Sequence, residues 1–362
     1  MELTSDSAIE ILLNNDPYSL DYETKNPIFL KAMRESLKHH YSNSKEFKNL
    51  CQGKSFDPSS IFQLNMIPFL PVSLFKKFLL KSISESEIFK TIHSSATTGN
   101  NPSTIILDRL TSRRQTKALV SIMSNYLSEK KDFIIFDTND LEEVSHEIKS
   151  RSSAIQGFLP FMNSINFVLD QNLSLDVEKI QSLNDKNSYC IFGFTWLLYK
   201  IINDNNNDKI KNYLRSLNHP YILHIGGWKK LQDLKISREF FYNQISDFFD
   251  TSKDKIIDLY GMTEQLGTIY PDCEFGHKHV PMYSEIIIRN PNTLNEQLVG
   301  ESGLIQLLSP IPHSYPGVSL LSDDLGHIVG IDDCPCGRKG KYFVFDKRSD
   351  KVEVKGCGDS IN

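Results

Sequence analysis

Residues 255–265 have the sequence KIIDLYGMTEQ, an apolar run followed by a turn that carries an aromatic ring, a hydroxyl and a carboxylate. The run 255–259 predicts a β-strand, and Tyr260-Gly261 predicts the turn that ends it. In sheets covered by helices, ligands sit at the carboxyl ends of the strands. The stretch therefore predicts an α/β sheet with polar turn residues beside its ligand. The alternative interpretation is a purely structural turn.

The alternation of strand and helix extends through the middle of the chain. Two further apolar runs, 132–136 and 221–225, predict strands. Residues 109–128 and 229–249 show the longer helical pattern. This order is typical of α/β proteins.

The two ends of the chain differ from this middle. Residues 5–50 have apolar positions at helical spacing, with abundant Lys, Glu and Leu. From about residue 268 the pattern changes to short strands and turns, which we predict at 284–288, 303–308, 319–321, 341–345 and 351–355. We therefore divide the chain into a helical N-terminal segment, 1–90, an α/β core, 91–267, and a β-rich subdomain, 268–362.

The composition excludes some classes of function. The chain has 362 residues, a net charge of -5 and an isoelectric point near 6.1, so no electrostatic pattern indicates nucleic acid or an anionic membrane as a partner. We find neither a secretory signal nor a membrane-spanning segment, and we expect a cytoplasmic protein without integral membrane association. The six Cys are unevenly spaced, which favours reduced thiols or metal ligands over disulfides.

Three other polar clusters lie beside predicted strands. Residues 93–103, HSSATTGNNPS, predict a loop whose small side chains let backbone N–H groups approach a phosphate. Residues 319–328 put Asp323 and Asp324 in a turn after an apolar strand, and residues 346–356 pair basic with acidic side chains. Taken singly, these clusters could be a surface turn, a helix cap and a solvated hairpin. Their joint occurrence in this order favours a site.

Together these motifs resemble those of the acyl- and aryl-adenylating enzymes. Within that superfamily the chain is most similar to the acyl-protein synthetases of bioluminescence and next to the phenylacetate-CoA ligases, through Gly-Gly-Trp-Lys at 226–229 and Cys-x-Cys-Gly-Arg at 334–338. The resemblance covers roughly residues 90–362. It implies the N-terminal core of the adenylate-forming fold, with residues 91–267 binding nucleotide and acyl group and without the usual C-terminal lid domain.

The resemblance also implies which residues bind the nucleotide. It assigns the phosphate loop to Ser94, Ser95, Thr97, Thr98 and Gly99. Three departures from the family pattern occur there: Ala96 replaces Gly, one extra residue precedes Pro102, and Ser103 replaces Lys. In the family, Gly-Gly lies beside the nucleotide and the acyl group, a role that falls on Gly226 and Gly227, although a strand-to-helix turn is the structural alternative.

The remaining nucleotide motifs follow in the family's order. Tyr260, Gly261, Thr263 and Glu264 match Tyr-Gly-x-Thr-Glu, which implies that Tyr260 stacks on adenine and that Glu264 holds Mg²⁺, a metal that prefers oxygen ligands. Asp324 matches the aspartate that grips the ribose, with Ser322-Asp323 in place of Thr-Gly. Arg348 and Asp350 match the hinge motif, with Lys347 in place of Gly.

The late cysteines predict a structural zinc site. Cys334 and Cys336 form a compact Cys-x-Cys turn, and Cys273 lies six residues before His279. Three thiolates and one imidazole make a closed tetrahedral set, as in structural Zn²⁺ sites. His277 is a competing ligand, and a reduced turn without metal is the alternative. Similar sets in the phenylacetate ligases support the zinc interpretation.

Cys357, between two glycines and near Lys355, has the surroundings of a reactive thiol. In the acyl-protein synthetases a cysteine near the C-terminus accepts the acyl group as a thioester, and Cys357 matches it by position. An incidental cysteine is the alternative. We take Cys357, Glu264, Thr263 and Arg348 as the candidate catalytic residues.

The leading hypothesis is a ligase that uses MgATP to convert a long-chain fatty acid to acyl-AMP and passes the acyl group through Cys357 to an acyl-reductase subunit. The chain stops at Asn362, so no residue matches the lysine of the family's lid domain. One alternative is an acyl- or aryl-CoA ligase that uses coenzyme A or another small acceptor. The other is a degenerate nucleotide-binding module, suggested by the missing phosphate-loop lysine and lid.

Overall fold

A computed structural model describes residues 7–94, 102–139, 146–184, 187–204, 208–228, 234 and 236–348. The described chain divides into two compact units. The first joins residues up to Asn125 to Gly261–Tyr270 and the residues from His277 onward; the second contains Tyr126–Tyr260 and Pro271–Gly276. Because N-terminal helices and C-terminal strands share the first unit, the divisions we drew at residues 90 and 267 do not coincide with these units.

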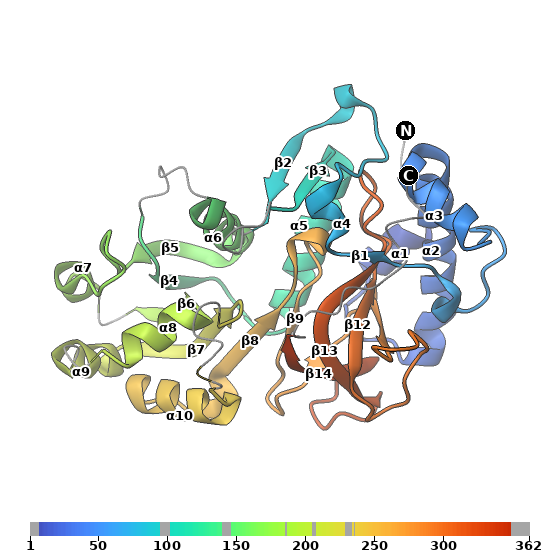
Figure 1. Ribbon diagram of the computed structural model, residues 1–362. Helices are drawn as coiled ribbons and strands as arrows, with labels where there is room; N and C mark the ends of the chain where they lie inside the picture. The colour runs from blue at the N-terminus through green and yellow to red at the C-terminus, as the bar shows by residue number, and fades with distance from the viewer. Residues whose placement is uncertain are drawn as a thin grey trace. The chain divides into compact units, whose positions relative to one another are not determined.

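The second unit is built on a parallel sheet with intervening helices, which agrees with the predicted α/β architecture. The strand order is β5-β4-β6-β7-β8, continued by the short β9, Tyr270–Pro271. The strands are β4 Lys131–Phe136, β5 Met162–Phe167, β6 Ser188–Phe194, β7 Asn218–Ile225 and β8 Ile256–Tyr260. The helices between them are α6 His146–Gly157, α7 Val177–Gln181, α8 Thr195–Ile202, α9 Asp208–Ser216 and α10 Arg238–Phe249 (Figure 1). The apolar runs of β4 and β6 are buried because helices cover a parallel sheet on both faces.

The first unit contains a mixed sheet and the N-terminal helices. The sheet order is β10-β14-β13-β12-β11, with β1 pairing β13. These strands are β1 Leu70–Pro71, β10 Lys278–His279, β11 Glu285–Arg289, β12 Gly303–Leu308, β13 Ser319–Ile331 and β14 Lys341–Arg348. A separate hairpin pairs β2, Lys90–His93, with β3, Thr104–Leu107. The helices are α1 Ala8–Asn14, α2 Tyr22–Asn43, α3 Lys45–Gly53, α4 Leu74–Lys77 and α5 Arg109–Ser124 (Figure 1).

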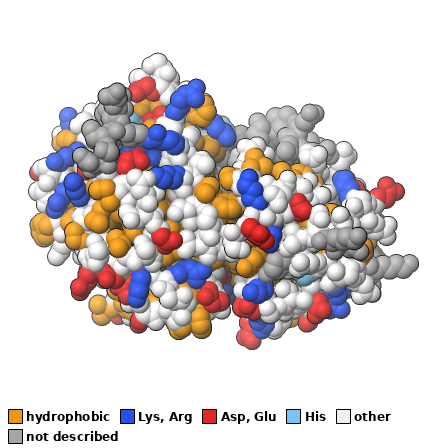
Figure 2. Space-filling model, turned by 180° about the vertical axis from the view of Figure 1, so that it is seen from behind, with side chains coloured by type: hydrophobic (Ala, Val, Ile, Leu, Met, Phe, Trp, Pro, Cys, Tyr) orange, Lys and Arg blue, Asp and Glu red, His pale blue; other side chains and the backbone are white. Residues whose placement is uncertain are grey.

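Single turns of 3-10 helix complete both units. They are η1 Leu64–Met66, η2 Glu85–Glu87, η3 Leu159–Phe161, η6 Lys253–Lys255 and η7 Thr263–Gln265. Within the described residues, no helix combines the length and the apolarity that crossing a bilayer requires. Acidic and basic side chains are interspersed on the face shown in Figure 2, in keeping with the balanced charge of the sequence.

Several boundaries differ from the sequence predictions. The strand expected at 319–321 continues to Ile331, so Asp323 and Asp324 lie within β13 and not in a turn. The strand tolerates these carboxylates because β14 lies alongside and Asp324 is opposite Arg348 in the register. Ser237 caps α10, so this helix begins at Arg238, whereas residues 229–233 and 235 of the helix predicted at 229–249 lie outside the described residues. The strand predicted at 351–355 lies outside the described residues.

Candidate functional site

Two serines hold the base of the predicted phosphate loop together. The Ser94 N–H donates to the Ser103 carbonyl at 3.0 Å, and the Ser103 N–H donates to Ser94 Oγ at 2.8 Å. These bonds extend the β2–β3 hairpin by one residue pair. The two residues between which the predicted phosphate loop begins and ends are therefore fixed relative to one another. Four predicted phosphate contacts, Ser95, Thr97, Thr98 and Gly99, lie in the segment 95–101, outside the described residues.

Glu264 is buried near the base of that loop. Its side chain belongs to η7, and the residue is 4% exposed. Burial raises the pKa of Glu264 above its ordinary value, whereas the Ser103 hydroxyl and the charges of Lys76 and Arg348 act in the opposite direction. A buried carboxylate among such groups is a suitable ligand for a hard cation.

The turn that carries Glu264 rests on two parts of the first unit. Gln265 Nε2 donates to the Gly317 carbonyl at 3.3 Å. Gly267 has a φ of +84° and lies against the backbone of Gln115 in α5. No side chain other than hydrogen fits there, because an added Cβ would come within 2.5 Å of the Gln115 Cα.

Asp324 and Arg348 form a pair across β13 and β14. Arg348 Nε lies 3.3 Å from Asp324 Oδ1, and the Asp324 N–H also donates to Ser322 Oγ at 3.2 Å. The Asp324 residue is 8% exposed, whereas the Arg348 side chain is 61% exposed. The charge of Arg348 also offsets part of the rise that burial causes in the pKa of Glu264. Glu264, Asp324 and Arg348, all predicted from the sequence, therefore share one electrostatic environment. Thr263 adjoins them in η7, and Asp350 and Cys357 lie outside the described residues.

In the second unit, Gly226, Gly227 and Tyr260 lie at the carboxyl ends of β7 and β8, where the sequence predicts them. Gly226 has a φ of +86°, and no atom of the described residues lies within 4 Å of the position that a Cβ of Gly227 would occupy. An open glycine at a strand end leaves room for a ligand to approach the backbone.

Sequence reasoning missed a buried histidine at the same edge. His224 is 3% exposed, and its Nδ1 lies 2.9 Å from Thr195 Oγ1 and 3.5 Å from Asp258 Oδ1. These groups sit near the carboxyl ends of β6, β7 and β8. The available signal was the single polar residue that interrupts the apolar run 221–225.

Sequence reasoning also missed an ion pair at the end of β4. Arg151 Nε lies 2.9 Å from Asp137 Oδ2, and both side chains are buried. In the sheet, β5 lies on one side of β4, whereas β6 and then β7 follow on the other side. The strand order therefore reverses between β4 and β6. Ligands of open α/β sheets bind where the strand order reverses in this way. The ion pair therefore lies at the expected binding edge of this unit.

The predicted zinc ligands lie close together. The ligand atoms of Cys273, His279, Cys334 and Cys336 are all within 4.8 Å of one another, and His279 Nε2 is 3.1 Å from Cys336 Sγ. Tetrahedral Zn²⁺ with ordinary bond lengths would separate its ligand atoms by about 3.5–3.8 Å. The spacing and the donor set therefore fit zinc.

The turns that present these cysteines have matching geometry. The Gly276 N–H donates to the Cys273 carbonyl at 2.7 Å, and the Gly337 N–H donates to the Cys334 carbonyl at 3.0 Å. Burial lowers the pKa of His279 to about 3, which keeps the imidazole neutral, as a metal ligand must be. The competing residue, His277, approaches Cys334 Sγ at 3.4 Å and is not one of the four clustered ligands.

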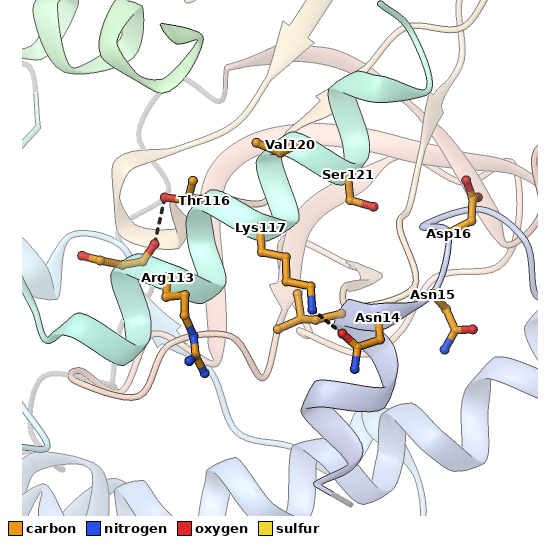
Figure 3. Close-up of a pocket in the computed structure, with 10 residues that line it drawn as sticks. Asn14, Asn15, Asp16, Arg113, Thr116, Lys117, Val120 and Ser121 are labelled. Carbon is orange, nitrogen blue, oxygen red and sulfur yellow. Dashed lines mark hydrogen bonds between the residues drawn. The ribbon is translucent and has the colours of Figure 1, made fainter. Parts of the chain in front are cut away.

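A groove of the first unit matched no sequence motif. It has a volume of about 750 Å³ and lies between the end of α1 and one face of α5. Figure 3 shows Lys117 extending from α5 towards Asn14, with which it forms a hydrogen bond. Thr116 Oγ1 donates to the Ser112 carbonyl within α5, so this hydroxyl is already partnered.

Comparison with protein families identifies the group to which the chain is related. The model of the acyl-protein synthetase family LuxE matches residues 1–362. The chain belongs to this family. It is 24% identical to a long-chain-fatty-acid–luciferin-component ligase of Aliivibrio fischeri over 99% of this chain and 94% of that protein. It is also 24% identical to the ligase of the same name from Vibrio harveyi, over 98% of this chain and 92% of that protein.

The family membership identifies the chain as an enzyme of the ligase class, of the acyl-protein synthetase type. Among solved structures, an open conformation of 2-hydroxyisobutyryl-CoA ligase in complex with 2-HIB-AMP and CoA superposes with a TM-score of 0.72. The match covers 98% of this chain and 82% of that chain at 14% identity. This similarity confirms the predicted adenylate-forming fold.

Proposed function

We propose that this enzyme uses ATP to activate a long-chain fatty acid and then transfers the acyl group to a protein thiol. The observation that carries the proposal is the match of the whole chain to the acyl-protein synthetase family, with Glu264, Asp324 and Arg348 close to the base of the predicted phosphate loop. The curated relatives, named for long-chain fatty acids, support the substrate class.

In the first step a carboxylate oxygen of the acid attacks the α-phosphorus of ATP. The bond from the α-phosphorus to its bridging oxygen breaks, and acyl-AMP and pyrophosphate form. We assign the phosphates to the loop above the Ser94–Ser103 clasp, the adenine to Tyr260 and the ribose to Asp324. Glu264 would hold Mg²⁺, which when bound neutralises charge on the phosphates. Arg348 would contribute a second cation near Glu264, where the phosphate-loop lysine of related enzymes is absent.

In the second step the thiolate of Cys357 attacks the acyl carbonyl, the bond to AMP breaks, and a thioester forms as AMP leaves. The thiol proton passes to solvent, because the thiolate is the reactive form. We propose that the thioester then supplies an acyl reductase. The sequence neighbours of Cys357, Gly356 and Gly358, have no side chains.

We assign a structural Zn²⁺ to Cys273, His279, Cys334 and Cys336. A four-ligand site leaves no position for substrate or water. Two of the ligands adjoin secondary structure of the first unit: His279 ends β10, and Cys334 follows β13 closely. The metal would therefore stabilise the turns around these strands and take no part in acyl transfer.

The decisive experiment is labelling of the full chain with radiolabelled tetradecanoate, with and without MgATP, followed by a denaturing gel and a hydroxylamine wash. An ATP-dependent, hydroxylamine-labile band that is absent in Cys357→Ser is the expected result. Pyrophosphate exchange with turnover to acyl-CoA and no labelled protein would favour the CoA-ligase alternative. ATP binding without exchange for any acid would favour the degenerate module.

A further inference from the structure

A buried loop between β12 and β13 is clamped at three consecutive carbonyls. His40 Nε2 lies 3.1 Å from the Pro312 carbonyl, and His39 Nε2 lies 2.9 Å from the His313 carbonyl. The Ser314 carbonyl accepts the Ser82 N–H at 2.7 Å. Two of these three partners come from α2, a helix in which the sequence shows no functional motif.

The opposite side of the same tripeptide is fixed to the start of α5. The backbone N–H groups of His313 and Ser314 both donate to Thr111 Oγ1 at 3.0 Å. The His313 ring approaches Asp108 Oδ2 at 2.6 Å through Nδ1. Asp108 also caps α5 by accepting the Thr111 N–H at 2.6 Å. Both faces of the tripeptide are therefore hydrogen-bonded, which leaves it little freedom to shift.

The same loop continues to Gly317, which contacts the turn that carries Glu264. Tyr315 is fully buried, and its hydroxyl lies 3.5 Å from Gln115 Nε2 of α5. Gly317 accepts the Gln265 side chain and packs closely, since an added Cβ there would lie 3.0 Å from the Glu264 carbonyl. Displacement of the tripeptide would therefore be transmitted to Glu264 over three to five residues of packed chain.

The two α2 histidines are hydrogen-bonded on both ring nitrogens. His40 Nδ1 lies 2.8 Å from Ser82 Oγ, and His39 Nδ1 lies 3.3 Å from Asn43 Nδ2, which donates. Burial lowers the pKa of both rings, so each is neutral with Nε2–H directed at a carbonyl. A neutral imidazole accepts a hydrogen bond at one nitrogen and donates one at the other, so each ring satisfies both of its partners in this buried site.

We propose that His39 and His40 are positioning residues that set the place of Glu264 by clamping Pro312–His313–Ser314. The inference deepens the proposed function, since it rests on Glu264 as a ligand of the MgATP complex. It gives the N-terminal helices a role in the reaction without any contact to substrate.

The test compares three variants of the full chain in ATP–pyrophosphate exchange. His39→Phe keeps a ring stacked on His313, at the present centroid distance of 4.0 Å, but removes the donor to its carbonyl. His39→Gln restores a donor at a similar reach. Arg34→Gln is the stability control, because Arg34 is also on α2 but donates to the Ile61 carbonyl, away from the clamp.

We expect His39→Phe to raise the half-saturating Mg²⁺ concentration about three- to tenfold, at or below the range for residues that support metal ligands, with KM for the acid unchanged. His39→Gln should recover most of the loss, and Arg34→Gln should lower stability without changing the Mg²⁺ requirement. An unchanged Mg²⁺ requirement in His39→Phe, or an equal change in Arg34→Gln, would overturn the proposal.

A second readout separates this inference from the proposed function. Binding of Mn²⁺ with a non-hydrolysable ATP analogue, followed by electron paramagnetic resonance, needs no turnover. If the wild type exchanges no pyrophosphate with any acid, the proposed reaction fails. Weaker Mn²⁺ binding in His39→Phe, recovered in His39→Gln, would then still support the clamp, and equal binding in all variants would refute it.

Discussion

Gly267→Ala should destabilise the protein through two separable effects. The first is conformational, because a φ of +84° costs an alanine about 1–2 kcal/mol. The second is steric, because the new Cβ would meet the Gln115 Cα at 2.5 Å and the Gln115 carbonyl oxygen at 2.7 Å. Backbone atoms cannot rotate away, so the turn must move, at a cost of about 1–3 kcal/mol. We expect a total loss of roughly 2–5 kcal/mol in the free energy of unfolding.

Gly300→Ala is the matched control for that substitution. Gly300 has nearly the same φ, +88°, but within the part of the chain that the structure describes no atom lies within 4 Å of the position a Cβ would take. It should therefore lose only the conformational part, about 1–2 kcal/mol. Urea unfolding of both variants gives the difference, and pyrophosphate exchange should fall only in Gly267→Ala, whose turn carries Glu264. Equal losses of stability in the two variants, or full pyrophosphate exchange in Gly267→Ala, would refute the reasoning.

Three further predictions concern stability. Lys25→Met should cost about 1–3 kcal/mol in urea unfolding, because it leaves the Ser284 carbonyl without its donor, while Glu285 keeps its ion pair with Lys341 at 3.3 Å. Lys81→Ala, at an exposed ion pair, should cost less than about 1 kcal/mol. Mass spectrometry should find one zinc per chain, and Cys336→Ser or a chelator should remove it and lower the melting temperature; a wild type without zinc contradicts the site. Burial raises the pKa of Asp108, but its hydrogen bonds outweigh this effect and hold the value at about 2 against 3.8, so its stabilisation is complete above pH 3.8 and is lost as the pH falls towards 2. Asp108→Asn should therefore remove about 2 kcal/mol at neutral pH and reduce the slope of acid unfolding between those values.

The strand-and-turn stretch at 255–265 predicted the α/β sheet because its signal is local. An apolar run of strand length followed by Tyr-Gly fixes both the strand and the edge at which it ends. The strand Gly303–Leu308 was predicted at its full length for the same reason. The clustering of the four predicted zinc ligands was also accessible, because each pair is close in sequence and the residue types are those that bind zinc.

The prediction of a turn at Asp323-Asp324 was wrong because the residue that stabilises a strand there is distant in the sequence. Two consecutive carboxylates favour a turn when only the neighbouring sequence is considered. In the structure, Arg348 lies opposite Asp324, 24 residues further along the chain, and makes the strand conformation tolerable for the charge. The Arg151–Asp137 pair and the contacts of His224 were missed for the same reason, since their partners lie on other elements.

The clamp on the loop, by contrast, left a signal in the sequence of α2. Its buried residues follow the helical period and include three polar side chains among the apolar ones: Lys25, Phe29, Ala32, Met33, Ser36, Leu37 and His40. A polar residue at a buried position of an amphipathic helix requires a partner, since leaving it without one costs about 1–3 kcal/mol. Lys25 meets Glu285 and His40 meets the Pro312 carbonyl, both more than 250 residues away. The helical period alone could therefore have identified α2 as a helix that holds distant polar groups, although only the structure shows that one of those groups, the Pro312 carbonyl, lies on the loop that contacts the turn of Glu264.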